Sequence, residues 1–194
     1  MRERNRQRTR TDILVAMSLL LGQKSFDSIT IEEVAKHAGV SRGTVYTYFP
    51  DGHEQLVREA YTRIGNLLDA DGSARRDQQV GATARIIALA TALVDIASTP
   101  EGRFYARIGT ATFGPLSGVT GQASSHFKQM LLEDLRQARN DGTLPADAPV
   151  EEIAVLVSGA LREIASVTAE HPEQADGLLR ALRRTCNALL TEAN

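Results

Sequence analysis

The chain lacks most of the features that would place it among enzymes, metalloproteins or membrane proteins. Its single cysteine, Cys186, cannot form a disulfide within the chain, and no apolar stretch is long enough to span a bilayer. It has no glycine-rich phosphate loop and no elbow sequence that would position a catalytic serine. The histidines are scattered, without carboxylate or cysteine partners at ligand spacing: His37, His53, His126 and His171. We therefore expect no enzymatic activity, no metal site and no cofactor.

The one stretch that resembles a targeting signal is better explained as a core helix. Five arginines within the first ten residues precede ILVAMSLLLG, which is superficially the order of a signal peptide. However, Ile13, Met17 and Leu20 fall on one helical face, and QKSFD follows where a cleavage site would need small residues. We expect a cytoplasmic protein with no membrane partner.

What the sequence does contain is helical periodicity along most of its length. With 194 residues and 42% hydrophobic content, the chain can bury a core in one or two domains. We find no convincing strand pattern, so the fold class expected is all-α, with eight or nine helices. Beyond the first 50 residues, we expect helices at 51–68, 80–98, 103–109, 123–140, 150–169 and 173–191, with an acidic, glycine-containing break at 69–73.

Two short helices are predicted with particular detail around residue 39. Thr30 and Glu33 form a capping box, so a helix should begin at Ile31. Ala35 is small enough to let a second helix approach closely, and Gly39 can take the left-handed conformation that ends the first helix. This spacing is typical of the first half of a helix-turn-helix.

The second helix of the pair is expected at Arg42–Tyr48. Ser41 is its cap, and Val45 is placed to pack back onto the preceding helix, with Phe49 buried after it. An ordinary helical hairpin would share any one of these features. Their combination in this register favours a DNA-binding helix-turn-helix.

The exposed face of this second helix carries groups suited to the major groove. They include a guanidinium for guanine edges or phosphates, a glycine that permits close backbone approach, hydroxyls and phenols. One of the two tyrosines could instead pack beneath the next helix. The candidate DNA-binding residues on this helix are Arg42, Gly43, Thr44, Tyr46, Thr47 and Tyr48, and Thr30 joins them from the first helix.

Charge is unevenly distributed along the chain. The formal net charge is −2, but residues 1–64 hold 10 Lys and Arg against 8 Asp and Glu, so a basic head precedes an acidic remainder. The first ten residues alternate arginine with polar residues and should form a disordered, solvated arm. Beside a helix-turn-helix, such an arm can follow phosphates or enter the minor groove, with Arg8 and Arg10 the most probable contacts.

These residues resemble the DNA-binding domain of the TetR family of transcriptional regulators. AGVSRGTVYTYF, residues 38–49, is similar to the family signature across the turn and recognition helix. TIEEVAKHAG supplies the first helix of the motif, and ILVAMSLLLGQKSFDSI, from Ile13, supplies the preceding scaffold helix and loop. The resemblance is specific over about the first sixty residues and only architectural beyond them.

The sequence departs from the family pattern just after Phe49. The loop there usually carries a Ser or Asn cap and then a lysine that contacts a phosphate, whereas this chain has Asp51 and Gly52. One phosphate contact is therefore in doubt, and the arginine arm would have to supply more of the contact. Asp51 with Glu54 is still expected to cap the next helix.

The resemblance implies two domains. An N-terminal three-helix DNA-binding domain with its basic arm would occupy residues 1–50, and a C-terminal helical bundle for effector binding and dimerisation would occupy residues 51–194. The helix at 51–68 would connect them. In the family the last two helices pair with those of a second subunit, and a two-fold dimer would double the base pairs read.

The resemblance also implies an effector pocket between the central helices of the body. The alanine-rich lining expected there favours a small apolar or aromatic effector. Each candidate polar residue could equally belong to a solvated face or a capping bond. The candidates are Arg103, Tyr105, Arg107, Thr110, Thr112, His126 and Arg162.

The function expected from these observations is a ligand-responsive transcriptional regulator. It would be a homodimeric repressor that binds a palindromic double-stranded DNA operator and is released by a small effector. Two alternatives remain open: a helical module that binds protein through its helix-turn-helix, and an activator or architectural DNA binder that has no effector.

Overall fold

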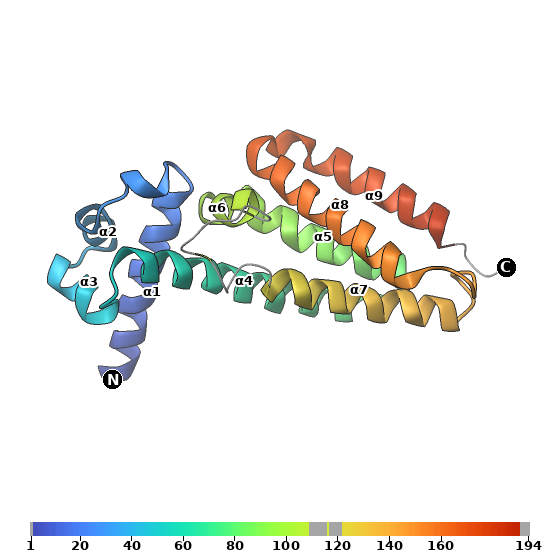
Figure 1. Ribbon diagram of the computed structural model, residues 1–194, viewed down its shortest axis with the longest axis horizontal. Helices are drawn as coiled ribbons and strands as arrows, with labels where there is room; N and C mark the ends of the chain where they lie inside the picture. The colour runs from blue at the N-terminus through green and yellow to red at the C-terminus, as the bar shows by residue number, and fades with distance from the viewer. Residues whose placement is uncertain (1, 109–115, 117–121, 191–194) are drawn as a thin grey trace.

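Helices form the whole architecture of the part of the chain that the computed structural model describes, residues 2–108, 116 and 122–190. A small head and an elongated helical body follow one another along the long axis of the molecule (Figure 1). The all-α prediction is confirmed. The head contains α1 (Arg2–Leu21), α2 (Ile31–Ala38) and α3 (Arg42–Tyr48), with a 3-10 turn at Phe26–Ser28. The body contains α4 (His53–Asp77), α5 (Ala82–Ser98), α6 (Pro100–Ile108), α7 (Gln122–Asn140), α8 (Val150–Glu170) and α9 (Ala175–Leu189).

The first helix scaffolds the head and is longer than expected. Ile13, Met17 and Leu20 are buried on its inner face, as the periodicity predicted. The helix begins at Arg2, so the expectation of a disordered arm over the first ten residues was wrong. The segment holds no glycine or proline, and its arginines and glutamines are good helix formers, so it extends the helix that the core has already nucleated.

The fourth helix passes from the head into the body without interruption (Figure 1). Leu56 and Val57 are buried near its start, and Leu68 near its middle. The predicted break at 69–73 does not occur, because Gly72 lies inside the helix where Phe127 packs against it; a Cβ at Gly72 would lie only 2.6 Å from the Phe127 ring. The glycine at this position therefore serves packing. Leu67, next to the buried Leu68, is exposed.

The body is built around α5. Nine of its residues are buried, and α4, α6, α7, α8 and α9 all pack against it. Thr99 ends this helix and Pro100 begins α6, where a missing backbone N–H costs nothing. Cys186 is buried within α9.

No single helix among the described residues combines the length and apolar character needed to cross a membrane. The pair α5 and α6 passes the length and composition test only when the two helices are taken together, and it is bent by 115°.

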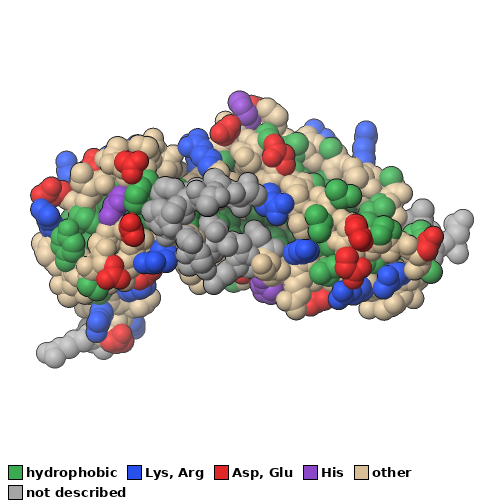
Figure 2. Space-filling view, viewed as in Figure 1, with side chains coloured by type: hydrophobic (Ala, Val, Ile, Leu, Met, Phe, Trp, Pro, Cys, Tyr) green, Lys and Arg blue, Asp and Glu red, His purple; other side chains and the backbone are tan. Residues whose placement is uncertain are grey.

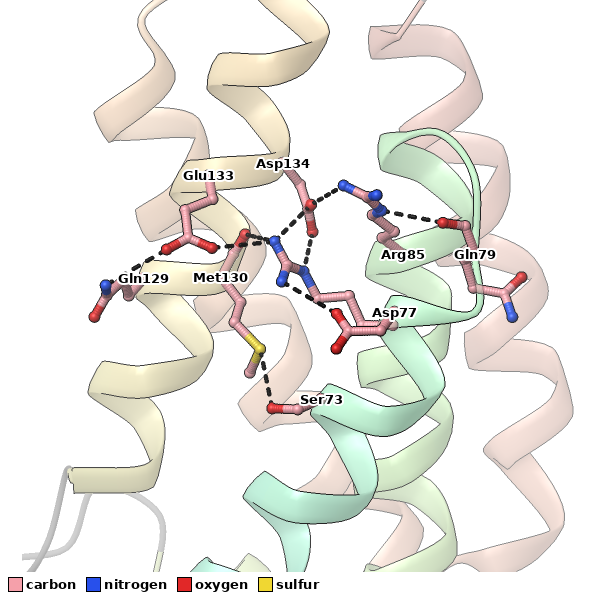
Figure 3. Close-up of polar contacts among 9 residues, drawn as sticks. Ser73, Asp77, Gln79, Arg85, Gln129, Met130, Glu133 and Asp134 are labelled. Carbon is pink, nitrogen blue, oxygen red and sulfur yellow. Dashed lines mark hydrogen bonds and ion pairs between the residues drawn. The ribbon is translucent and has the colours of Figure 1, made fainter.

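A polar cluster ties the far end of α4 to the rest of the body (Figure 3). The Asp134 side chain on α7 is fully buried and accepts hydrogen bonds from Nε and Nη2 of Arg76, both at 2.8 Å. Nη1 of Arg85, on α5, donates to the same carboxylate at 3.0 Å. The exposed Glu133 also accepts from Arg76, at 3.2 Å. One buried carboxylate thus joins α4, α5 and α7.

Replacing Asp134 should destabilise the body strongly. In Asp134→Ala two arginines lose their buried counter-charge, and we expect the free energy of unfolding to fall by about 3 kcal/mol. Urea denaturation followed by circular dichroism measures this loss. Glu133→Ala is the matched control, because its exposed ion pair with Arg76 should contribute less than about 1 kcal/mol. Equal losses in the two variants would contradict the role given to Asp134.

Candidate functional site

The turn between α2 and α3 is fixed by local bonds at both helix ends. The Thr30 hydroxyl accepts from the Glu33 amide at 3.2 Å, while a Glu33 carboxylate oxygen accepts from the Thr30 amide at 3.0 Å. This is the predicted capping box. Gly39 ends α2 with φ of 67°, the left-handed conformation that a side chain disfavours. The two helices are therefore held at their predicted boundaries.

The third helix is capped and anchored as expected. The Ser41 side chain accepts from the Thr44 amide at 3.1 Å, and the first helical residue is Arg42. Val45 is completely buried, and so is Phe49 at the end of the helix. Anchoring on this side turns the opposite side of the helix to solvent.

The solvent side of α3 presents an arginine and a tyrosine together. The Arg42 guanidinium lies 5.7 Å from the centre of the Tyr46 ring, four residues on, and 3.5 Å from a Glu32 carboxylate oxygen. Tyr46 is 41% exposed, which is unusual for an aromatic side chain in a helix this small. Hydrogen bonding to Tyr46 and the charge of Glu32 raise the pKa of Arg42. Both predicted groove-facing groups are thus available on one surface.

The remaining candidates on α3 differ in exposure. Gly43 and Thr47 are exposed, and the Thr47 hydroxyl donates to the Gly43 carbonyl at 2.9 Å. Thr44 is half-buried and its hydroxyl bonds with that of Ser41 at 2.8 Å. Tyr48 is half-buried against the head core. Of the two tyrosines, Tyr48 is therefore the one that packs.

The candidate DNA-binding residues outside α3 differ in exposure and in the contacts they already make within the protein. Thr30 is exposed, although its hydroxyl already serves the α2 cap. Arg8 is exposed on α1. Arg10 is half-buried: it forms an ion pair with Glu59 of α4, and its guanidinium lies 5.2 Å from the Phe49 ring centre. Arg10 thus links α1 to α4 beneath the end of the recognition helix.

The backbone conformation explains why a glycine stands at position 52, where the TetR-family pattern usually has a lysine. Gly52 is buried, with φ of 69° and ψ of −132°, which L residues rarely adopt, and the Tyr46 ring lies 3.6 Å from where its Cβ would be. The expected capping by Asp51 was wrong, because Gly52 takes the cap position and no side chain bonds there. Instead, the Asp51 amide donates to Gln55 Oε1 at 3.1 Å.

A cavity of about 50 Å³ lies in the body between α4, α5, α6, α7 and α8. Its wall is mainly apolar, and two buried tyrosines, Tyr61 and Tyr105, stack within it with ring centres 4.6 Å apart. Burial raises the pKa of both phenols. The lining residues are Tyr61, Leu68, Leu93, Ile96, Tyr105, Ala106, Phe127, Ser158, Leu161, Arg162 and Ala165.

The predicted pocket residues are distributed unevenly around this cavity. Tyr105 and Arg162 line it. Arg103, Arg107 and His126 do not, and Arg107 and His126 are exposed. Thr110 and Thr112 lie outside the described residues.

The cavity residues that sequence reasoning missed are mostly apolar or aromatic. Tyr61 and Leu68 stand seven residues apart on one face of α4, a spacing that a core stripe shares. Phe127 and Ser158 likewise resemble interior packing residues. No sequence signal distinguishes the wall of a cavity from the filling of a core.

The face of the molecule in Figure 2 carries basic and acidic side chains mixed over both head and body. No single-sign patch dominates the head in this view.

Comparisons with known proteins agree with this geometry. Residues 13–60 match the family model of bacterial regulatory proteins, tetR family. The HTH-type transcriptional regulator SrpR of Pseudomonas putida is 27% identical over 169 residues, which cover 83% of this chain and 75% of SrpR. The resemblance to the TetR family is confirmed.

Solved structures of similar shape extend over nearly the whole chain. A structure described as a TetR-family transcriptional regulator from Rhodococcus sp. superposes with a TM-score of 0.74 at 17% identity, covering 95% of this chain and 100% of the other. AibR, solved with isovaleryl coenzyme A and operator DNA, gives 0.73 at 12% identity, covering 95% and 100%. At these identities the likeness shows the fold.

The bonds around Glu33 predict a measurable titration. Hydrogen bonds from Lys24, at 2.5 Å, and from the Thr30 amide lower the pKa of the Glu33 carboxyl to about 2. A lowered folded-state pKa stabilises the fold above the unfolded value of about 4.3, and this stabilisation is lost as pH falls toward 2. The stability difference between wild type and Glu33→Gln should therefore be full at pH 6 and shrink below about pH 4.3.

Urea denaturation at a series of pH values measures this difference, and an NMR titration of the Glu33 carboxyl gives its pKa directly. Glu32→Gln, on the exposed neighbouring residue, is the control. A Glu33 carboxyl that titrates at the ordinary value would show that the capping box does not hold in solution.

Proposed function

We propose that this chain, a helix-turn-helix regulator of the TetR family, is a homodimeric repressor that binds a palindromic operator and is released from it by a small effector. The observation that carries the proposal is the continuity of α4, whose residues belong both to the head core and to the cavity wall. A ligand in the cavity and a DNA site at the head would therefore act on the same rigid element.

The solvent side of α3 supports DNA as the partner. Arg42 and Tyr46 offer a guanidinium and a phenol on one surface, with Gly43 and Thr47 beside them. These groups suit base edges and phosphate oxygens in the major groove.

Exposed apolar residues on the last two helices support a dimer. Leu156 on α8 is 73% exposed, and Val155 and Leu189 are also exposed on α8 and α9. Contiguous exposed apolar surface is typical of protein interfaces, and Val155 and Leu156 are adjacent members of such a surface on α8. Pairing through a two-fold axis would set the two recognition helices to half-sites about 34 Å apart, or a multiple of that distance.

The lining of the cavity supports a small effector with an apolar or aromatic body, and at about 50 Å³ the cavity has to widen by movement of its lining side chains to admit one. Most of its wall is aliphatic or aromatic, and its few polar groups converge from α4, α6 and α8. Release would follow a population shift, in which the effector favours a spacing of the two heads that no longer matches successive grooves.

Specific binding to operator DNA can be tested with the DNA upstream of its own gene. We expect Arg42→Ala and Tyr46→Ala each to abolish the specific complex in a gel shift while leaving the helical circular dichroism unchanged, because both side chains are exposed. Lys128→Ala, which removes one positive charge from an exposed side chain on α7, should bind as wild type does. Unchanged binding by both α3 variants would remove DNA contact from this surface.

The salt dependence of the same gel shift separates base contacts from phosphate contacts. A lost phosphate contact lowers the slope of log affinity against log salt concentration by about 1. Absence of any specific, salt-sensitive complex at this promoter or its neighbours would count against the repressor.

The proposed dimer interface predicts a monomeric variant. Leu156→Arg places a charge where the partner subunit would pack, so sedimentation at micromolar concentration should show a monomer, and operator affinity should fall at least about tenfold. Val80→Arg is the matched control, since Val80 is 93% exposed on the loop between α4 and α5. A Leu156→Arg protein that still sediments as a dimer would place the interface elsewhere.

A further inference from the structure

One side of the cavity is built from aromatic rings that can face a ligand. Tyr61 and Tyr105 stack at an interplanar angle of 27°, and Phe104 meets Tyr61 edge-on with ring centres 6.3 Å apart. Phe127 reaches the same wall from α7. Stacked phenols combine a π surface with hydroxyl groups, which suits a ligand that has an aromatic ring or an organic cation.

A carboxylate lies next to this aromatic wall. Asp69 follows the cavity residue Leu68 on α4 and lies eight positions after Tyr61, about 80° from it around the helix axis, so its carboxylate lies at the edge of the helical face that carries Tyr61 and Leu68. Across from it on α7, His126 precedes the cavity residue Phe127, and His126 Nδ1 lies 3.4 Å from Asp69 Oδ2. The charge of Asp69 is close enough to contribute to the raised pKa of the Tyr105 phenol.

Among the described residues, the second carboxylate oxygen of Asp69 has no hydrogen-bond partner. Its Oδ1 atom is buried, and no hydrogen bond reaches it from the described part of the chain. Burial raises the pKa of this carboxyl, and His126, at the exposed edge, only partly opposes the effect. A buried acceptor that lacks a donor is unfavourable until a donor arrives, and a cationic donor satisfies it best.

We propose that the cavity binds a small protonated amine with an aromatic or apolar body, its ammonium group donating to Asp69 Oδ1 and its ring packing on Tyr61 and Tyr105. This inference rests on the proposed function, because it assigns the chemical class of the effector. Arg162, the one charged residue among the described residues that line the cavity, is exposed, so its guanidinium remains hydrated and does not set the sign of the ligand.

Three probes of one shape and different charge test this assignment. They are 2-phenylethylamine, 2-phenylethanol and phenylacetate, which are positive, neutral and negative at pH 7. Calorimetric titration of the full chain should give an affinity for 2-phenylethylamine at least about tenfold higher than for 2-phenylethanol, with phenylacetate weakest. Equal affinities, tightest binding of phenylacetate, or no binding of the amine at millimolar concentration would overturn the proposal.

Two variants test whether the charge of Asp69 causes the preference for the amine over the alcohol. In Asp69→Asn the preference for the amine over the alcohol should disappear, while binding of the alcohol is retained. Asp71→Asn is the matched control. Asp71 lies two residues after Asp69 and carries the same charge, but its carboxylate is already paired with Arg75. A preference that survives Asp69→Asn, or one that is lost equally in Asp71→Asn, would show that Asp69 does not hold the amine.

Operator binding provides the separate test of the function on which this inference rests. Asp69→Asn should bind operator DNA as wild type does, and 2-phenylethylamine should weaken the wild-type complex only. If wild type forms no specific DNA complex yet binds the amine through Asp69, the repressor proposal fails and the ligand assignment stands. If DNA binds and the amine does not, the ligand assignment alone fails.

Discussion

The burial of α4 in two separate cores is the constraint on which the rest of the structure depends. Its first turns complete the head, where Leu56 and Val57 are fully buried, and its later turns complete the body, where Leu68 is buried. A straight helix of 25 residues is about 37 Å long and bends little, so both cores must accept one common axis. The recognition helix is positioned against this axis through Phe49 and the Arg10–Glu59 ion pair. The packing of the head and the packing of the body are therefore coupled through α4.

The cavity lies beside the middle of α4, where Tyr61 and Leu68 line it. Beyond it, Arg76 and Asp134 fix the C-terminal end of α4 to α7 and α5, and the head core holds the N-terminal end. A group that enters between these two attachments meets Tyr61 and Leu68 directly. Because packed interfaces have discrete arrangements and resist continuous deformation, the proposed effector would favour one arrangement of the head over another through even a small displacement there.

The parts of the fold that depend on local bonds could be predicted from the sequence almost to the residue. The capping box at Thr30, the left-handed Gly39 and the Ser41 cap each act within a few residues, so α2 and α3 begin and end where expected. Interactions between distant segments could not be read in this way. Gly72 resembled a helix break because its packing partner, Phe127, is 55 positions later in the chain. The cavity wall was missed for the same reason, since its residues have core chemistry and only their three-dimensional arrangement leaves a space.

The continuity of α4 also sets the rotational relation between the two domains. Each helical residue adds about 100° of rotation and 1.5 Å of rise. Inserting one residue between Ile64 and Leu68 would keep both cores intact in composition and still turn the head by roughly a quarter of a circle relative to the body. In a two-fold dimer both recognition helices would turn at once. The number of residues between the two buried parts of α4 therefore fixes how the recognition helices are oriented toward the DNA grooves. Exchanging heads between related regulators must preserve this helical phase as well as the residues that read DNA.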